Sequence, residues 1–198
     1  MAYPILASNF SWYKSSQARS TITQINIVDS DTPTGNEPES WNADTGNTGS
    51  IKCYRIGTVV TIAGNGSGKI SVNASSIGFF ANSTNVRFTS LKHITGANLL
   101  DTSNVTTVNS MFYGCTSLIS VDVSNWNLSN LTSMKTMFYE CKALTELDVS
   151  KWNLSKVTSM QGAFRECNSL TNLPAGNWDV SNVTDMSYMF YECNSLST

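Results

Sequence analysis

Residues 130–155 read NLTSMKTMFYECKALTELDVSKWNLS, and this stretch decides the fold because the chain repeats it. Its cysteine returns every 26 residues, at Cys115, Cys141, Cys167 and Cys193. The phenylalanine of MFYEC and the tryptophan of KWNLS keep the same interval in the neighbouring units. A register that holds without an insertion predicts an array of equivalent structural units.

The repeat divides the chain into two expected domains. Residues 1–76 read as a β-rich N-terminal capping or attachment segment, and residues 77–198 as the array. The array consists of a degenerate unit at 79–103, whole units at 104–129, 130–155 and 156–181, and a partial unit at 182–198. We expect the β-rich segment to pack on the first unit and to cover an edge that would otherwise be exposed.

Each unit predicts one short helix and one short strand. Four apolar residues have the spacing i, i+3, i+4, i+7 of a helix face, namely Met134, Met137, Phe138 and Cys141. LTELDV (144–149) then has the L-x-x-L-x-L strand pattern of leucine-rich repeats. The predicted fold class is therefore an α/β solenoid, a leucine-rich-repeat array with a small β-rich cap.

One helix and one strand cannot bury their apolar faces alone, so stacking must provide the core. We predict the cysteines to be reduced, since packed helices lie about 8–10 Å apart and a disulfide tolerates a Cα separation of at most about 6.8 Å. The tryptophans could be sugar-stacking platforms, but a recurrent large apolar residue favours the core. The predicted core is Met111, Phe112, Cys115, Trp126, Met134, Met137, Phe138, Cys141, Trp152, Met160, Phe164, Cys167, Trp178, Met186, Met189, Phe190 and Cys193.

The strand positions between the apolar ones predict an outward surface with two columns of side chains. Solenoids commonly bind their ligands on such a surface. The first column is Ser120, Glu146 and Asn172, extended by His93, and the second is Asp122, Asp148 and Pro174. The candidate ligand-binding residues are His93, Ser120, Asp122, Glu146, Asp148 and Asn172.

Several patterns suggest chemistry, but each has a simpler explanation. Asp122 and Asp148 could form a catalytic carboxylate pair or a weak calcium site, yet the repeat alone would bring them together. His93 is the only histidine, which excludes a histidine cluster for zinc. AGNGSGKI (63–70) has Ala63 and Ile70 where a phosphate-binding loop needs Gly and Ser or Thr, so we predict a hairpin turn. We expect no enzyme, no catalytic residue, no metal and no cofactor.

Composition narrows the partners and the location. A net charge of −2 gives no reason to expect nucleic acid or an acidic membrane surface as partner. The sequence has no run of about 20 apolar residues, so we expect no membrane insertion. No secretory signal is visible. Charged residues make up only 13%, against about 25% in typical domains, which favours an extracellular, cell-surface or virion location. The last unit ends without a capping sequence, which suggests a truncated chain, a short natural product or a homo-oligomer that covers this end.

The motifs resemble a known family. NVTDMSYMFYECNSL and LDVSKWNLSKVTSM look like bacterial BspA-type leucine-rich repeats of the mycoplasma surface lipoprotein variety, and AFRECNSL is similar to the A-F-x-x-C-x-x-L core of the wider class. WYKSSQARSTITQINI and GTVVTIAGNGSGKI are similar to segments that precede such arrays. The resemblance implies a non-enzymatic cell-surface module for adhesion, which binds a protein or glycan on another cell or matrix. Related prophage-encoded proteins imply the alternative of a phage or prophage virion component, either a tail-associated receptor binder or a structural protein.

Overall fold

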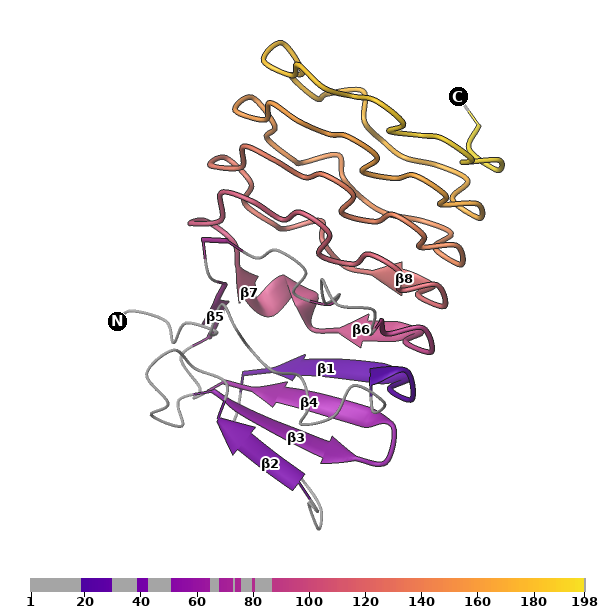
Figure 1. Cartoon of the computed structure of the whole chain (residues 1–198). Helices are drawn as coiled ribbons and strands as arrows, with labels where there is room; N and C mark the ends of the chain where they lie inside the picture. The colour runs from indigo at the N-terminus through magenta and orange to yellow at the C-terminus, as the bar shows by residue number, and fades with distance from the viewer. Residues whose placement is uncertain are drawn as a thin grey trace.

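In the described residues, the main sheet has six strands. The structure is a computed structural model that describes residues 19–29, 39–42, 51–64, 68–72, 74–75, 80 and 87–197. The strand order is β2-β3-β4-β1-β6-β8 (Figure 1). These strands are β1 (Gln24–Val28), β2 (Glu39–Asn42), β3 (Lys52–Ile56), β4 (Val59–Ala63), β6 (His93–Thr95) and β8 (Ser120–Val121). A parallel pair, β5 (Ile70–Ser71) with β7 (Leu100–Asp101), forms a second sheet, and η1 (Ala97–Leu99) is a short 3-10 helix.

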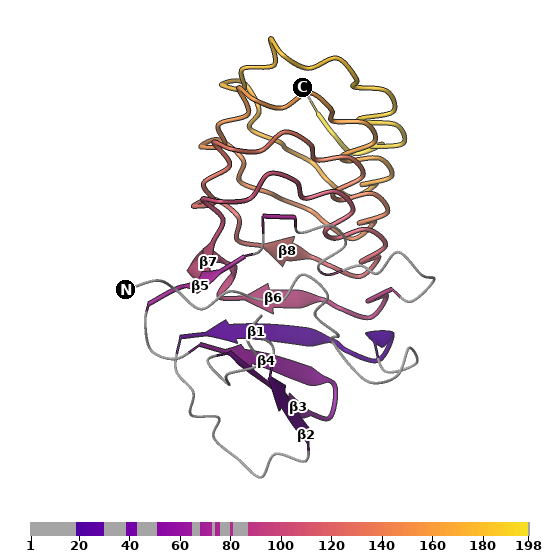
Figure 2. The same cartoon turned by 60° about the vertical axis from the view of Figure 1, so that its left-hand side comes forward.

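The main sheet runs from the N-terminal segment into the array. β1 pairs in parallel with β6, so that Gln24 lies beside His93. β6 in turn pairs in parallel with β8, which places His93 beside Ser120. Both views show the later repeats continuing the stack from β8 toward the C-terminus (Figure 2). The sheet therefore includes strands from both sides of the boundary expected near residue 76. The division into domains at 1–76 and 77–198 stays a prediction.

We call the repeating units coils: coil 1 is 104–129, coil 2 is 130–155, coil 3 is 156–181 and coil 4 is 182–197.

The prediction of an α/β solenoid with strand-plus-helix units was wrong, because the described part of each coil contains no α-helix. The segments expected to be helical are turns. In coil 2, the N–H of Tyr139 donates to the carbonyl of Thr136 at 3.2 Å, but the N–H of Phe138 donates to Ala163 of coil 3 at 2.8 Å. Backbone bonds thus alternate between a turn and the next coil. The molecule is dominated by a mixed sheet and stacked turns.

Left-handed backbone angles explain why no helix forms. Thr136 has a φ of 50° and Glu140 a φ of 61°, and such angles cannot continue a right-handed helix. Gly114 and Gly162 occupy equivalent positions with φ of 72° and 58°. The apolar spacing misled the prediction because a run of short turns also brings every third or fourth side chain to one side.

Regular strands are also rarer in the coils than the leucine-rich pattern predicts. Coil 1 contributes β8, which spans two residues. In coil 2, the predicted strand at 144–149 provides only the isolated parallel bridge from Glu146 to Asn172. Further isolated bridges, such as Ser133 to Ser159, join other sides of the coils. Single cross-coil bonds therefore take the place of long ladders.

Two details of the N-terminal segment also differ from expectation. β2 lies within the stretch 31–50 that reads as a loop, and it pairs antiparallel with β3. β4 and β5 do not form the hairpin predicted for AGNGSGKI, because β4 pairs with β1 and β3 whereas β5 pairs with β7. Residues 65–67 of that loop lie outside the described residues. The backbone N–H of Gly68 donates to Oδ1 of Asp29 at 2.9 Å.

The core follows the repeat positions through coils 1 to 3. One phenylalanine per coil forms a stacked column, with centroid distances of 4.9 Å from Phe112 to Phe138 and 5.6 Å from Phe138 to Phe164. Coil 4 has a described neighbour on one side, so Phe190 is 42% exposed and Met186 is 41% exposed. Trp178 and Cys193 are half-buried, and the other predicted core residues are buried: Met111, Phe112, Cys115, Trp126, Met134, Met137, Phe138, Cys141, Trp152, Met160, Phe164, Cys167 and Met189.

The tryptophans belong to this core. Trp126 and Trp152 are 3% exposed, which leaves no ring face on which a sugar could stack. The Nε1 of Trp152 donates to the carbonyl of Val123 in coil 1 at 3.1 Å, and Trp178 donates to Val149 in the same way at 3.1 Å. A buried indole needs such a partner. Each tryptophan therefore fills the core and also ties its coil to the one before.

Candidate functional site

The register places the candidate binding residues in two columns on the outward face of the sheet. In the first column His93 lies beside Ser120, and Glu146 lies beside Asn172. The N–H of Thr145 donates to the carbonyl of Ile119 at 3.2 Å, which joins the two halves of the column. The second column follows two residues later in each coil. Equivalent side chains of neighbouring coils are spaced as the backbones are, and neighbouring strands lie about 4.8 Å apart.

These columns line a hollow with a volume of about 550 Å³, which we call the sheet-face hollow. It brings together five of the six candidate residues but not His93, which lies one strand away on β6. Val121 and Leu147 line it too, and they are buried at 6% and 3% exposure. The full lining is Ser120, Val121, Asp122, Glu146, Leu147, Asp148, Asn172 and Pro174.

Two aspartates of the sheet-face hollow are held by serines of their own coils. Oδ1 of Asp122 accepts the backbone N–H and the hydroxyl of Ser124, at 3.2 and 2.7 Å. Oδ1 of Asp148 accepts the same two groups of Ser150, at 3.0 and 2.6 Å. The Ser150 hydroxyl, and then its N–H, lower the pKa of the Asp148 carboxyl below its ordinary value. Asp148 is therefore an ionised carboxylate at neutral pH, suited to binding rather than to donating a proton.

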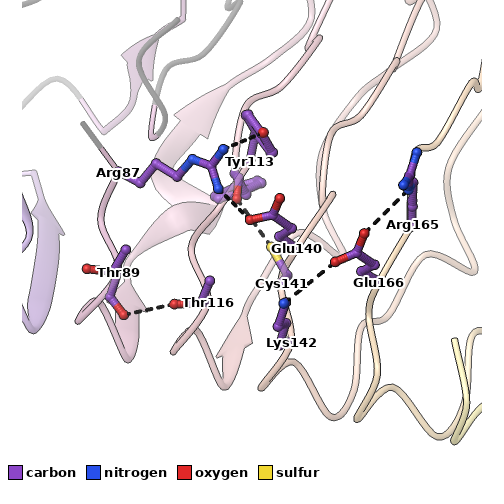
Figure 3. Close-up of polar contacts among 10 residues, drawn as sticks. Arg87, Thr89, Tyr113, Thr116, Glu140, Cys141, Lys142, Arg165 and Glu166 are labelled. Carbon is purple, nitrogen blue, oxygen red and sulfur yellow. Dashed lines mark hydrogen bonds and ion pairs between the residues drawn. The ribbon is translucent and has the colours of Figure 1, made fainter. Parts of the chain in front are cut away.

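The described ion pairs lie outside the sheet-face hollow. Glu140 pairs with Arg87, and Glu166 pairs with Lys142 at 3.6 Å and with Arg165 at 3.5 Å (Figure 3). None of the eight residues that line the hollow belongs to one of these pairs. Within the part of the chain that the structure describes, the carboxylates of the hollow thus form no ion pair. The charge of Lys151 contributes to the lowered pKa of Asp148, after the larger contribution of the Ser150 hydrogen bonds.

A column of tyrosines and arginines is a second cluster, which sequence reasoning missed. Tyr113 and Tyr139 stack at 4.9 Å between ring centroids. The Arg87 guanidinium lies 4.2 Å from the ring centre of Tyr113, and that of Arg165 lies 4.9 Å from Tyr139 and 5.1 Å from Tyr191. The signal was available, since positions 113, 139, 165 and 191 are one repeat position. The rings of Tyr113 and Tyr139 face one another or a guanidinium, so this part of the column joins coils, whereas Tyr191 in coil 4 is 48% exposed.

The cysteines form a third column, inside the core. The thiol of Cys141 donates to the carbonyl of Phe112 at 3.2 Å, and that of Cys167 donates to Phe138 at 3.2 Å. Burial raises the pKa of Cys115 to about 12 and raises that of Cys141 well above its ordinary value. All five cysteines are free thiols. A protonated, buried thiol is a poor nucleophile and a poor metal ligand.

The described residues also lack two other kinds of site. No group of three or more His, Cys, Asp or Glu side chains in these ranges could hold a metal ion. Among the same residues, no helix is long and apolar enough to cross a bilayer. The sheet-face hollow is therefore the main candidate site in the described structure.

Comparison with known protein families gives a match that covers the coils. Residues 78–198, more than half of the chain, match the family described as Mycoplasma protein of unknown function, DUF285. No curated protein and no solved structure matches the chain. The match begins one residue before the degenerate unit and includes His93 and all residues of the sheet-face hollow. The chain therefore belongs to the DUF285 family of Mycoplasma proteins.

Proposed function

We propose that this protein is a non-enzymatic recognition module of a bacterial surface. In this proposal it works outside the cell and binds a protein or glycan on another cell or matrix through the outward face of its sheet. Two observations support it: the family match to Mycoplasma proteins and the resemblance of the repeats to BspA-type surface proteins.

The sheet-face hollow is the observation that carries the proposal. It gathers Ser120, Asp122, Glu146, Asp148 and Asn172 from three successive coils into one concave surface. Their hydroxyl, carboxylate and amide groups can donate or accept hydrogen bonds from a polar partner. Stacked repeats use such extended surfaces for binding, because the rigid coils fix the spacing of the side chains.

The other columns are suited to stability. The cysteine thiols and tryptophan indoles donate hydrogen bonds to carbonyls of the preceding coil. The tyrosine rings stack on each other or on arginine. The aspartates of the hollow, in contrast, are exposed and keep an oxygen for which no described residue provides a donor. Binding capacity is therefore concentrated on the sheet face.

A blocked hollow tests the proposal. We expect the purified chain to bind members of an array of matrix proteins and glycans, and Asn172→Trp to abolish that binding by filling the hollow. The matched control is Asn104→Trp, at an exposed position outside the hollow. Equal circular dichroism spectra and melting temperatures would establish that both variants fold. Binding that survives in Asn172→Trp, or that both variants lose equally, would contradict the proposal.

A further inference from the structure

The sheet-face hollow is acidic. Three of its polar residues, Asp122, Glu146 and Asp148, are carboxylates on two neighbouring coils, and its lining contains no Lys, Arg or His. All three are exposed, and none belongs to a described ion pair. Like charges about 5 Å apart repel one another, and a cationic partner removes that repulsion.

Local hydrogen bonds leave these carboxylates able to accept more. Oδ1 of Asp122 and Oδ1 of Asp148 each take both donors of a serine two residues later. No described residue donates to the second oxygen of either group. Ammonium and guanidinium groups are the side chains that bind a carboxylate most strongly.

The surface around the hollow is polar and extends further than the coils. Along the sheet, Thr95 lies beside Asn26, and the Thr95 hydroxyl donates to Oδ1 of Asn26 at 2.9 Å. Gln24 lies beside His93, which lies beside Ser120. This outward face therefore continues from the hollow across β6 to β1, and it can contact an extended ligand that is longer than the hollow itself.

These observations favour one class of partner. Nucleic acid and anionic lipid carry the wrong charge for the hollow. A neutral glycan would leave the three carboxylates unpaired, and burying unpaired charge is costly. An extended polypeptide with basic side chains would pair with the carboxylates, and its flanking part would meet the imidazole of His93, the hydroxyl of Thr95 and the side-chain amides of β1.

We propose that the sheet-face hollow binds a basic segment of a protein partner, with lysine or arginine side chains against Asp122, Glu146 and Asp148, and that the segment continues across β6 toward β1. This inference rests on the proposed function, because it names the partner class of the same surface. It goes further than the proposed function, because it assigns the attraction between the hollow and its partner to opposite charges.

A labelled peptide of alternating lysine and serine, titrated against the full chain by fluorescence anisotropy, tests the inference. The variant Asp122→Asn, Glu146→Gln, Asp148→Asn keeps the acceptors for the serines and removes three negative charges. The control Asp179→Asn, Asp185→Asn, Glu192→Gln removes the same number outside the hollow. We expect the first variant to bind about tenfold more weakly and the control to change by less than about twofold. Wild-type binding should weaken as salt rises.

An equal loss in both variants would mean that net charge alone attracts the peptide and would overturn the inference, as would no binding to the wild type. A charge reversal gives a second readout: Glu146→Lys should weaken binding of the lysine peptide, whereas Glu192→Lys should not. If Glu146→Lys binds the lysine peptide as tightly as the wild type does, the inference is wrong.

The outcome is separable from the proposed function. If Asn172→Trp abolishes binding to the protein and glycan array but the triple neutral variant does not, the surface binds without charge and only the inference fails. If neither variant affects array binding or peptide binding, both fail. Asn172→Trp should block the lysine peptide as well if both are correct.

Discussion

Coil 2 and coil 4 share the motif MFYEC at equivalent positions but have different surroundings, and the comparison shows where the stability of the array originates. Met134 and Phe138 of coil 2 are fully buried, whereas their equivalents in coil 4, Met186 and Phe190, are more than 40% exposed. The turns themselves are alike, since both Glu140 and Glu192 have φ near 60°. The local backbone is therefore set within each coil, but burial depends on a neighbour on each side.

The largest expected difference between the two coils comes from a buried charge. Cys141 is fully buried and its thiol donates to the carbonyl of Phe112. Cys141→Asp would place a carboxylate there with no donor, a cost of several kcal/mol, on the order of the whole stability of a small domain. We expect it to abolish cooperative unfolding in urea. Cys193→Asp should fold, because Cys193 is half-buried. A Cys141→Asp variant that folds as well as Cys193→Asp would contradict this difference between the two coils.

Removing one ring from the phenylalanine column should have the next largest effect. Phe138 lies between two rings, at 4.9 Å from Phe112 and 5.6 Å from Phe164. We expect Phe138→Ala to lower the free energy of unfolding by about 3–5 kcal/mol. Phe190→Ala, at 42% exposure, should cost less than half as much. Urea denaturation followed by tryptophan fluorescence measures both, and equal losses would contradict the stacking account.

A smaller effect concerns the indole hydrogen bonds. Trp152→Phe removes the indole donor that lies 3.1 Å from the carbonyl of Val123, while that carbonyl keeps the backbone N–H of Trp126 at 3.1 Å. Because the carbonyl keeps one donor, we expect a loss of about 0.5–1.5 kcal/mol. Trp178→Phe removes the same bond from a half-buried site, so water can replace the donor and the loss should be smaller. Thermal unfolding of the two variants under the same conditions measures both losses, and equal losses would contradict the role of the bonds.

The smallest expected effect concerns the pKa of an exposed carboxyl and not the burial of core residues. The Ser150 hydroxyl is the first cause of the lowered pKa of Asp148, so Ser150→Ala should move that pKa back toward the ordinary value of about 3.9. A carboxyl with a lowered folded pKa contributes stability above its unfolded pKa, and this contribution is lost as pH falls through the folded pKa. Carbon NMR titration of Asp148 measures the shift. Ser181→Ala, which acts on Asp179, should leave Asp148 unchanged.

The sequence showed the interval of the coils, the apolar residues that face inward and the two outward columns, because all three depend only on register. The spacing of Met134, Met137, Phe138 and Cys141 could not separate a helix from a chain of turns, since both bury the same positions. Gly114 and Gly162 were the available signal for the turns, because left-handed angles favour glycine.

Other features depended on contacts between distant segments. β2 lies in a stretch rich in Pro, Gly and Asp that local preference assigns to a loop, and it is a strand because β3 pairs with it. The sheet-face hollow also needed the structure, because the depth between coils depends on how they stack. His93 belongs to the right column, but it lies on β6, beyond the residues that line the hollow.

The central claim is that recognition occurs at the sheet face and not along the other columns. Amide NMR spectra of the isotope-labelled chain, recorded during titration with the lysine and serine peptide, test it most directly. We predict saturable shifts at Ser120 to Asp122, at Glu146 to Asp148 and at Asn172, with little change at Tyr113, Tyr139 or Arg165. Shifts centred on the tyrosine and arginine column, or spread evenly over the chain, would contradict the account.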